Sequence, residues 1–138
     1  MLIYHLRNKA KLITPEIGDA GFDITCYSDF ALAPDEQAEV VTGITVAIPN
    51  GYVGLIRDRS SIARRQIYTH GGVIDSTYRG ELIVMIRNHS RTGAFFQAGN
   101  KIAQLIVVPY CSAAQRVHVP EALGRTIRDK SGFGSTGA

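Results

Sequence analysis

Apolar residues at every second position are the feature that most constrains this chain. From position 40 to position 48, every even-numbered residue is valine, threonine or isoleucine. Successive side chains of a strand point to opposite faces, so this spacing predicts one long, half-buried strand. Shorter strand-like runs occur along the rest of the chain, each bounded by glycine, proline or asparagine: 2–6, 22–27, 52–56, 66–69, 82–86, 95–96 and 102–108. Only residues 60–66 have the composition for a turn or two of helix.

The number and shortness of these runs predict an all-β fold, a sandwich or distorted β-barrel. The 138 residues contain no internal repeat and no linker, so we expect one domain. Many short strands leave sheet edges unprotected, and a closed sheet or strand exchange between subunits would cover them. Residues from about 125 to 138 are small, polar and rich in glycine, which indicates a flexible arm.

Composition argues against several classes of protein. No stretch of ~18 apolar residues is present, so we expect no membrane span, and the amino terminus does not resemble a signal peptide. Cys26 and Cys111 are far apart, which indicates free buried thiols in a reducing compartment such as the cytoplasm. The four histidines are scattered, and we expect no His/Cys metal cluster.

The net charge of +3 is compatible with an anionic partner, either nucleic acid or a small phosphorylated ligand. Arginines are dense near positions 57–65. No basic tail and no alternation of aromatic and basic residues accompanies them, so we expect no nucleic-acid binding.

The stretch 71–81, GGVIDSTYRGE, places a carboxylate and a tyrosine inside an otherwise apolar β-hairpin. The hairpin would be formed by the runs 66–69 and 82–86. Glycines in such a segment allow a ligand or another backbone to approach closely. The ordinary interpretation is that Asp75 and Ser76 only form a turn, because both residue types bond their own backbone.

Three other segments interrupt strand-like runs with polar or glycine residues. Arg59, Ser60 and Ser61 open the one helical turn, where they would either cradle an anion or cap the helix. Gln104 sits in an apolar strand, and a buried amide needs a backbone or ligand partner. Residues 132–137, GFGSTG, are similar to a phosphate-binding glycine loop with one aromatic ring, but taken alone they favour a disordered terminus.

Five segments, in this order, resemble the five motifs of the trimeric deoxyuridine triphosphatase (dUTPase) family. They are AGFDI (20–24), RSSIA (59–63), GGVIDSTYRGE (71–81), GNKIAQLI (99–106) and RDKSGFGSTG (128–137). The resemblance implies a β-jelly-roll homotrimer whose three active sites each use all three subunits. It also implies Mg²⁺-assisted hydrolysis of dUTP to dUMP and pyrophosphate, in the cytoplasm, or in the host cytoplasm or nucleus if the chain is viral.

On the nucleoside side, the resemblance implies roles for five residues. Asp75 would orient and deprotonate the attacking water and contact the sugar 3′-hydroxyl. Tyr78 would pack under the deoxyribose and leave no room for a 2′-hydroxyl. The backbone near Val73, Ile74 and Ile83 would bond the edge of uracil as a paired strand would.

On the phosphate side, the resemblance assigns the phosphate oxygens to Arg59, Ser60, Ser61 and Gln104. Asp23 would support the Mg²⁺ shell through water. The arm of another subunit would close over the nucleotide, with Arg128 on the phosphates, Phe133 stacked on the base, and Gly134 and Ser135 in the glycine loop.

These residue types suit the reaction. Attack on the α-phosphorus needs an aligned water, a base, and positive charge around the oxygens. Mg²⁺ prefers oxygen ligands and retains waters, so a triphosphate and one remote carboxylate suffice.

The chain departs from the family pattern at three places. Thr77 stands where a second acid is common, Ser61 replaces glycine, and residues 129–131 are less rich in glycine.

Two alternatives differ from this interpretation. The dCTP deaminases share an RSSxAR stretch that here extends to Arg64, but they need a glutamate where this chain has Met85, so proton shuttling is disfavoured. A trimeric dUTP-binding regulator without catalysis would use the same binding residues, and only turnover separates it from the enzyme.

Overall fold

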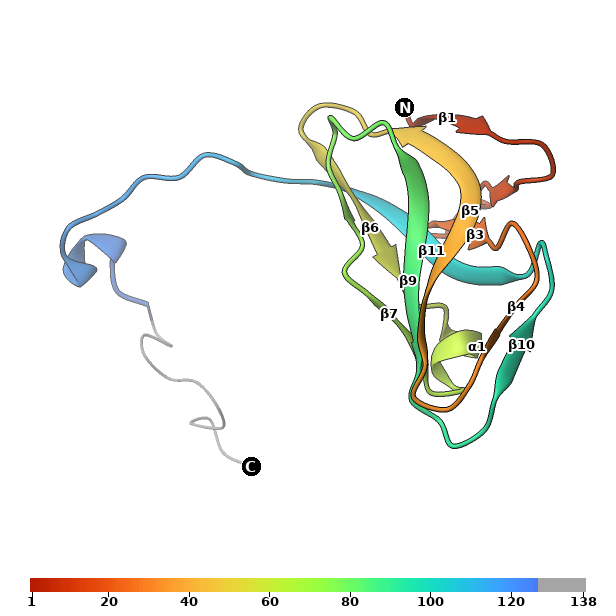
Figure 1. Ribbon diagram of the computed structural model, residues 1–138. Coiled ribbons are helices and arrows are strands. Elements are labelled where there is room, and N and C mark those ends of the chain that lie inside the picture. Colours follow the sequence, from red (N-terminus) through yellow and green to blue (C-terminus); the bar gives the residue numbers. More distant parts are fainter. Residues whose placement is uncertain (127–138) are drawn as a thin grey trace.

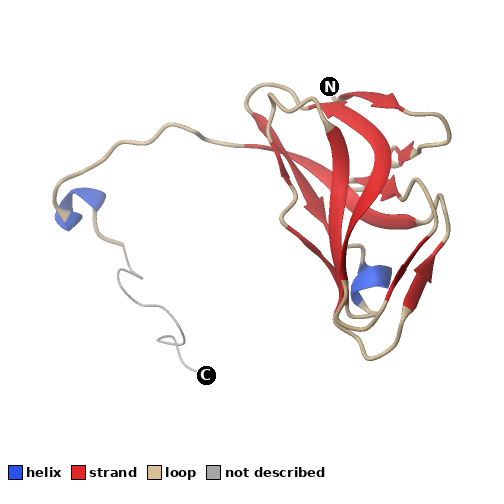
Figure 2. Cartoon of the chain, viewed as in Figure 1, coloured by secondary structure: helices blue, strands red, loops and turns tan. Residues whose placement is uncertain are grey.

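The computed structural model describes residues 1–126, and it is built almost entirely of antiparallel strands (Figures 1 and 2). One sheet has the order β1 (Ile3–Leu6), β5 (Gln37–Ala47), β9 (Glu81–Asn88), β7 (Ile67–His70). The second has the order β2 (Leu12–Ile13), β3 (Phe22–Thr25), β11 (Lys101–Pro109), β6 (Tyr52–Arg57), β8 (Val73–Ile74). A two-stranded ribbon joins β4 (Phe30–Leu32) to β10 (Ala94–Phe96), and the helical turns are α1 (Ser60–Ala63) and the 3₁₀ turn η1 (Pro120–Leu123). The predicted all-β class is confirmed.

The two sheets share one hydrophobic core. It combines Ile44 and Val84 of the first sheet with Ile24 and Leu105 of the second, all fully buried. The alternation between positions 40 and 48 sends each of its even-numbered residues into this core, as the sequence predicts. Burial of each large aliphatic side chain contributes about 1.5–3 kcal/mol, so the shared core fixes the sheets on which the site is built.

The beginning of β9 is fastened to an irregular part of β5. Pairing between these strands is interrupted between Val41 and Thr45. The Glu81 carboxylate accepts hydrogen bonds there from the backbone amides of Gly43, at 2.6 Å, and Thr42, at 3.2 Å. Glu81 therefore satisfies two amides that strand pairing leaves open, and it fixes the point where the 71–81 segment rejoins the sheet.

The expected hairpin forms, but its connection is more elaborate than a loop. β7 and β9 pair from Ile67 opposite Asn88 to His70 opposite Met85. Between them, β8 crosses to the second sheet and pairs with β6. Gly72 allows this crossing because its φ is +87° and a Cβ there would lie 2.8 Å from the Ile56 Cβ. The close backbone approach expected at these glycines is thus made by the neighbouring strand.

Other features differ from the sequence-based expectation. The sequence did not predict β2, β4, β8 or η1, which are short and lack a clear period of two. Cys26 is a free buried thiol, but Cys111 is exposed, so the expectation of two buried thiols is wrong for Cys111. Cys111 lies after Pro109, where the chain leaves the body in an extended course toward η1 (Figure 1). Among residues 1–126, no helix is long and apolar enough to cross a membrane.

Candidate active site

The edge strand β8 forms one wall of a small pocket. β8 is the last strand of the second sheet, so the outer backbone edge of Val73 and Ile74 has no strand partner among residues 1–126. The pocket has a volume of about 170 Å³ and is lined by Val73, Ile74, Asp75, Tyr78, Glu81 and Ile83. The structure thus brings together all five residues that the sequence assigned to the nucleoside. A free strand edge beside an apolar pocket can pair with a planar ligand that carries donors and acceptors.

Tyr78 is held in place at the mouth of this pocket. Its hydroxyl donates a hydrogen bond to the Glu81 carbonyl at 2.9 Å, and its amide donates to the Asp75 carbonyl at 3.1 Å. The ring occupies the space where a Cβ on Gly80 would lie, so only glycine fits at position 80. Tyr78 is therefore fixed from both sides, and a fixed aromatic ring can reject a larger sugar by steric contact.

The Asp75 carboxylate forms no hydrogen bond or ion pair with any other residue in the described part of the chain. The side chain is exposed and borders two hollows. The second hollow, of about 350 Å³, is lined by Tyr52, Val53, Val73, Asp75, Ser76, Thr77 and Tyr110. Residues 75–78 do form a turn, closed by the hydrogen bond from the Tyr78 amide to the Asp75 carbonyl, but the Asp75 carboxylate does not bond the backbone as the turn-forming interpretation expects. Asp75 is thus available to a ligand or a water.

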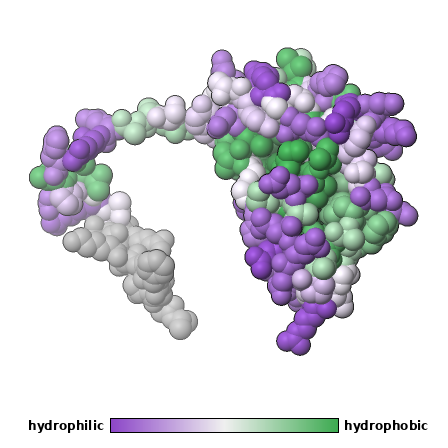
Figure 3. Space-filling model, in the orientation of Figure 1, coloured by the Kyte–Doolittle hydropathy of each residue, from purple (hydrophilic) through white to green (hydrophobic). Residues whose placement is uncertain are grey.

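Figure 3 shows apolar side chains gathered over the upper parts of β6 and β9 on the face in view. The exposed apolar residues of these strands and of β8 include Tyr52, Val73 and Ile83. Val73 is 65% exposed, which is high for a valine in a strand. The nucleoside pocket is consequently bordered by a surface that favours contact with apolar or aromatic groups.

A second, polar pocket gathers the residues that the sequence assigned to phosphate. It has a volume of about 230 Å³ and is lined by Asp19, Ala20, Gly21, Asp23, Arg59, Ser60 and Gln104. Gln104 donates a hydrogen bond from Nε2 to the Asp58 carbonyl at 2.8 Å, which provides its expected backbone partner. This bond orients the amide in the pocket wall and leaves the amide oxygen on the other side of the group.

Arg59 and Lys101 meet on the carboxylate of Asp23. Arg59 Nε donates to Asp23 Oδ1 at 2.8 Å, and Lys101 Nζ lies 2.7 Å from Oδ2. Two cations share the Asp23 carboxylate, while Asp19 brings a second carboxylate to the pocket lining. The Arg59 guanidinium has further N–H groups, for which a phosphate group is a suitable partner. The sequence-based assignment omitted Lys101, although it belongs to the GNKIAQLI segment, where its charge was the available signal.

The helical turn α1 begins at Ser60 without a side-chain cap. Its N-cap residue is Arg59, and no side chain bonds the first amides. The capping interpretation of Ser60 and Ser61 is therefore wrong. Both serines are exposed, with Arg59 Nη1 at 3.5 Å from the Ser61 hydroxyl. Ser60 lines the polar pocket, whereas Ser61 does not.

The two pockets lie apart on one chain. The pairing registers place Asp23, Gln104 and Arg57 in one row across the second sheet. Ile74, next to Asp75, lies opposite Gly54, near the other end of β6. At about 3.3 Å per residue, the backbone from Gly54 to Arg57 spans roughly 10 Å. Arg128, Phe133, Gly134 and Ser135, the remaining assigned residues, lie outside the described residues.

The residues of the polar pocket could contact a magnesium ion only through its bound water molecules. No group of three or more His, Cys, Asp or Glu in residues 1–126 could enclose a metal ion. Asp23 supplies one carboxylate, and both its oxygens already meet cations. Mg²⁺ commonly keeps its waters and binds chiefly to substrate phosphates, so contact with Asp23 through water agrees with this donor set.

Comparison with known proteins identifies the family. The family model described as dUTPase matches residues 8–137. The chain belongs to the dUTPase family. The deoxyuridine 5′-triphosphate nucleotidohydrolase of Cutibacterium acnes is 45% identical over 125 residues, covering 87% of this chain and 80% of that protein. The enzyme of the same name from Hydrogenobaculum is 37% identical and covers 99% and 97%.

Solved structures agree with this assignment. A point mutant of the Staphylococcus bacteriophage 80alpha dUTPase with dUpNHpp has a TM-score of 0.89 and 27% identity, covering 100% of this chain and 99% of that chain. A mutant dUTPase from phage phi11 of S. aureus, described with a structural Mg(II) ion, has a TM-score of 0.80 and 26% identity, covering 88% and 99%. The prediction of a nucleotide hydrolase of this family is confirmed. The deaminase alternative is not favoured, and Met85 stands between Glu39 and His70 in the sheet rather than supplying an acid.

Proposed function

We propose that this chain hydrolyses dUTP to dUMP and pyrophosphate at sites formed between the subunits of a homotrimer. The observation that carries the proposal is the separation, within one subunit, of the pocket that gathers the nucleoside residues from the pocket that gathers phosphate residues. A base must lie within about 3 Å of the water it activates, and the reacting atoms must approach to about 3–3.5 Å. Asp75 and the Arg59 guanidinium, bound to Asp23, are too far apart in one subunit. A neighbouring subunit would supply the missing half.

The reaction requires one nucleophile and one leaving group. Asp75 accepts a proton from a water molecule, and the water oxygen attacks the α-phosphorus. The bond between the α-phosphorus and its bridging oxygen breaks, and pyrophosphate leaves with the bonding electrons. The unpartnered carboxylate of Asp75 supports its role as the base. Arg59 and Lys101 would offset the negative charge that develops on the phosphate oxygens.

Substrate selection follows from fixed groups around the nucleoside pocket. The free edge of β8 would pair with the donors and acceptors of uracil. Cytosine would place a donor against a donor there, which leaves buried polar groups unpaired and lowers affinity strongly. Tyr78, fixed by Glu81 and Gly80, would exclude a ribose 2′-hydroxyl.

Two further contributions complete the proposed site. Magnesium, held by the phosphates and by Asp23 through water, would neutralise charge on the triphosphate. The extended segment after Pro109 leaves the body (Figure 1), which supports delivery of Arg128, Phe133, Gly134 and Ser135 to another subunit. An exposed extended segment carrying Val119 and Leu123 gains apolar burial only against a second surface.

The test is turnover by the full-length protein with dUTP and Mg²⁺, followed by phosphorus NMR. We expect dUMP and pyrophosphate, with dCTP and UTP hydrolysed far more slowly. Asp75→Asn preserves the shape of the side chain, so it should retain binding of a non-hydrolysable dUTP analogue and lose hydrolysis. Binding without turnover in the unaltered protein would instead support a regulator, and near-normal turnover in Asp75→Asn would exclude Asp75 as the base.

A further inference from the structure

A third hollow lies at the far end of α1 and is lined by cations. It has a volume of about 400 Å³, and its walls are Arg64, Arg65, Gln66, Ser90 and Arg91. Three of these five residues are arginines, and none is acidic. The positive charge is therefore concentrated around one open space rather than spread along the surface.

None of the three arginines forms an ion pair with a residue in positions 1–126. Within residues 1–126, ion pairs are formed only by Arg59 and Lys101 with Asp23, by Arg87 with Asp35 and by Arg7 with Glu81, so the three arginines of the hollow are among several cations without one. Like charges that share a hollow repel one another, and an anion between them removes the repulsion. Binding of an anion in the hollow would therefore be electrostatically favourable.

Hydrogen bonds from a buried asparagine and from the backbone fix the two segments that carry these arginines. Asn88 is fully buried, and its amide group donates to the Thr92 carbonyl at 2.8 Å while its oxygen accepts from the Ser90 amide at 3.0 Å. The His89 amide donates to the Gln66 carbonyl at 2.8 Å, which ties this turn to the end of α1. The segments on either side of the hollow are therefore held in position before any ligand binds.

Arg65 is also oriented by an aromatic ring. Its guanidinium carbon lies 4.9 Å from the centre of the Phe96 ring, and Phe96 is buried. A cation that stacks on a ring keeps its N–H groups free at the edge of the guanidinium plane. Arg65 can therefore donate to an anion without giving up this contact.

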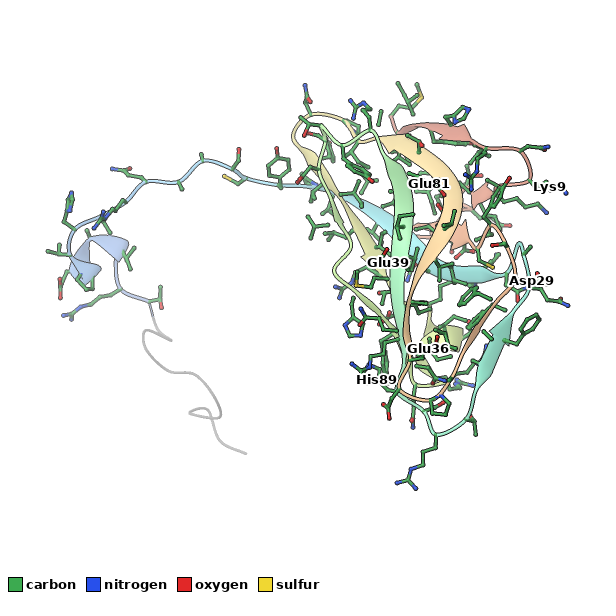
Figure 4. The ribbon with its side chains drawn as sticks, viewed as in Figure 1. Lys9, Asp29, Glu36, Glu39, Glu81 and His89 are labelled. Atoms are coloured by element: carbon green, nitrogen blue, oxygen red, sulfur yellow. The ribbon has the colours of Figure 1, made fainter. Side chains whose placement is uncertain are left out.

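The hollow is separate from the nucleoside pocket. Ser90 follows the end of β9, whereas Glu81, which lines the nucleoside pocket, begins it. Figure 4 shows Glu81 and His89 at opposite ends of this strand. The seven steps from Glu81 to Asn88, at about 3.3 Å each, place the two ends roughly 23 Å apart. The hollow also shares no residue with the Asp23–Arg59 pocket.

We propose that this hollow is a second anion site, which binds the diphosphate or triphosphate group of a small ligand. Guanidinium groups bind phosphate oxygens in pairs, and three of them match a compact anion that carries several charges. An extended polynucleotide would need cations along a line, whereas these converge on one space. The two sources of such a group are free pyrophosphate and the phosphate chain of a nucleotide. The site does not depend on where dUTP is hydrolysed.

The experiment is calorimetric titration of the full-length protein with pyrophosphate. We expect two classes of site. Arg59→Gln should weaken one class, and Arg64→Gln and Arg91→Gln should each weaken the other at least tenfold, since a charge-assisted hydrogen bond contributes enough for such a change. Lys11→Ala removes one exposed charge outside the hollow and is the matched control, expected to leave both classes unchanged.

Three results would overturn the proposal. Only one class of site, lost in Arg59→Gln, would show that the hollow binds nothing. Unchanged affinity for pyrophosphate in both Arg64→Gln and Arg91→Gln would show that these arginines do not bind the anion. If Lys11→Ala weakened pyrophosphate binding as much as the arginine variants do, the loss of affinity would come from the change in net charge alone. A parallel titration with ATP identifies the source: tighter binding than pyrophosphate assigns a nucleotide, and weaker binding assigns free pyrophosphate.

Discussion

Replacement of Gly72 tests how β8 is positioned, and Gly71 provides a matched control. Both glycines have positive φ, +87° for Gly72 and +66° for Gly71. A Cβ on Gly72 would lie 2.8 Å from the Ile56 Cβ and 3.1 Å from the Ile56 carbonyl oxygen, whereas a Cβ on Gly71 would meet nothing within 4 Å. Alanine at either position therefore incurs the backbone strain, but only alanine at 72 also collides with a neighbour.

The expected losses in the free energy of unfolding follow from these contacts. An alanine in the left-handed region costs about 1–2 kcal/mol, so Gly71→Ala should lower the free energy of unfolding by that amount. Overpacking adds about 1–3 kcal/mol, which gives about 2–5 kcal/mol for Gly72→Ala. Ile56 is buried and cannot move away, so we expect β8 to shift instead and to lose the 2.7 Å hydrogen bond from the Ile56 amide to the Gly72 carbonyl.

The assay has two parts, urea unfolding and dUTP kinetics, both at equal subunit concentration because assembly affects apparent stability. Gly72→Ala should raise KM for dUTP more than Gly71→Ala does, since β8 forms a wall of the nucleoside pocket. Equal stability and equal KM in the two variants would refute the view that close packing of Gly72 on Ile56 positions this strand.

Three further predictions concern single groups. Tyr78→Ala should let UTP compete better with dUTP, while Tyr78→Phe should keep discrimination; if the alanine variant still rejects UTP as before, Tyr78 does not exclude the 2′-hydroxyl. Truncation before Arg128 should preserve the oligomer and strongly lower kcat; unchanged kcat would show that the arm is dispensable. At pH 8, a thiol reagent should modify Cys111 before Cys26, because burial raises the pKa of the Cys26 thiol and less thiolate is present. Faster labelling of Cys26 would contradict this order.

The sequence predicts the fold class and most strands because apolar alternation records which face of a strand is buried. The long strand at positions 40–48 shows this most clearly, since its even-numbered residues all enter the core. The sequence-based prediction misses β8, because a strand of two residues is too short to show alternation. The pairing of β8 with β6 depends on tertiary contacts around Gly72. The prediction of a buried thiol fails for Cys111 because a cysteine in the extended segment after Pro109 has no local signal of exposure.

The candidate site could be predicted residue by residue but not in its arrangement. Short motifs identify Asp75, Tyr78, Arg59 and Gln104 by residue type. They do not reveal that these residues occupy two pockets at different ends of β6, because that depends on strand register. Lys101 was missed for a related reason: its partner Asp23 is distant in sequence and becomes a neighbour only through the pairing of β3 with β11.

The most direct test of a site shared between subunits is complementation of two inactive variants. Asp75→Asn removes the proposed base, and Arg59→Gln removes a phosphate contact from the other pocket. Subunits of both kinds are mixed in equal amounts, unfolded, refolded together and assayed for dUTP hydrolysis. If each site takes Asp75 and Arg59 from different subunits, random assembly should restore about one quarter of the unaltered rate. A mixture no more active than its two components would show that both residues act within one subunit, or that they do not act together.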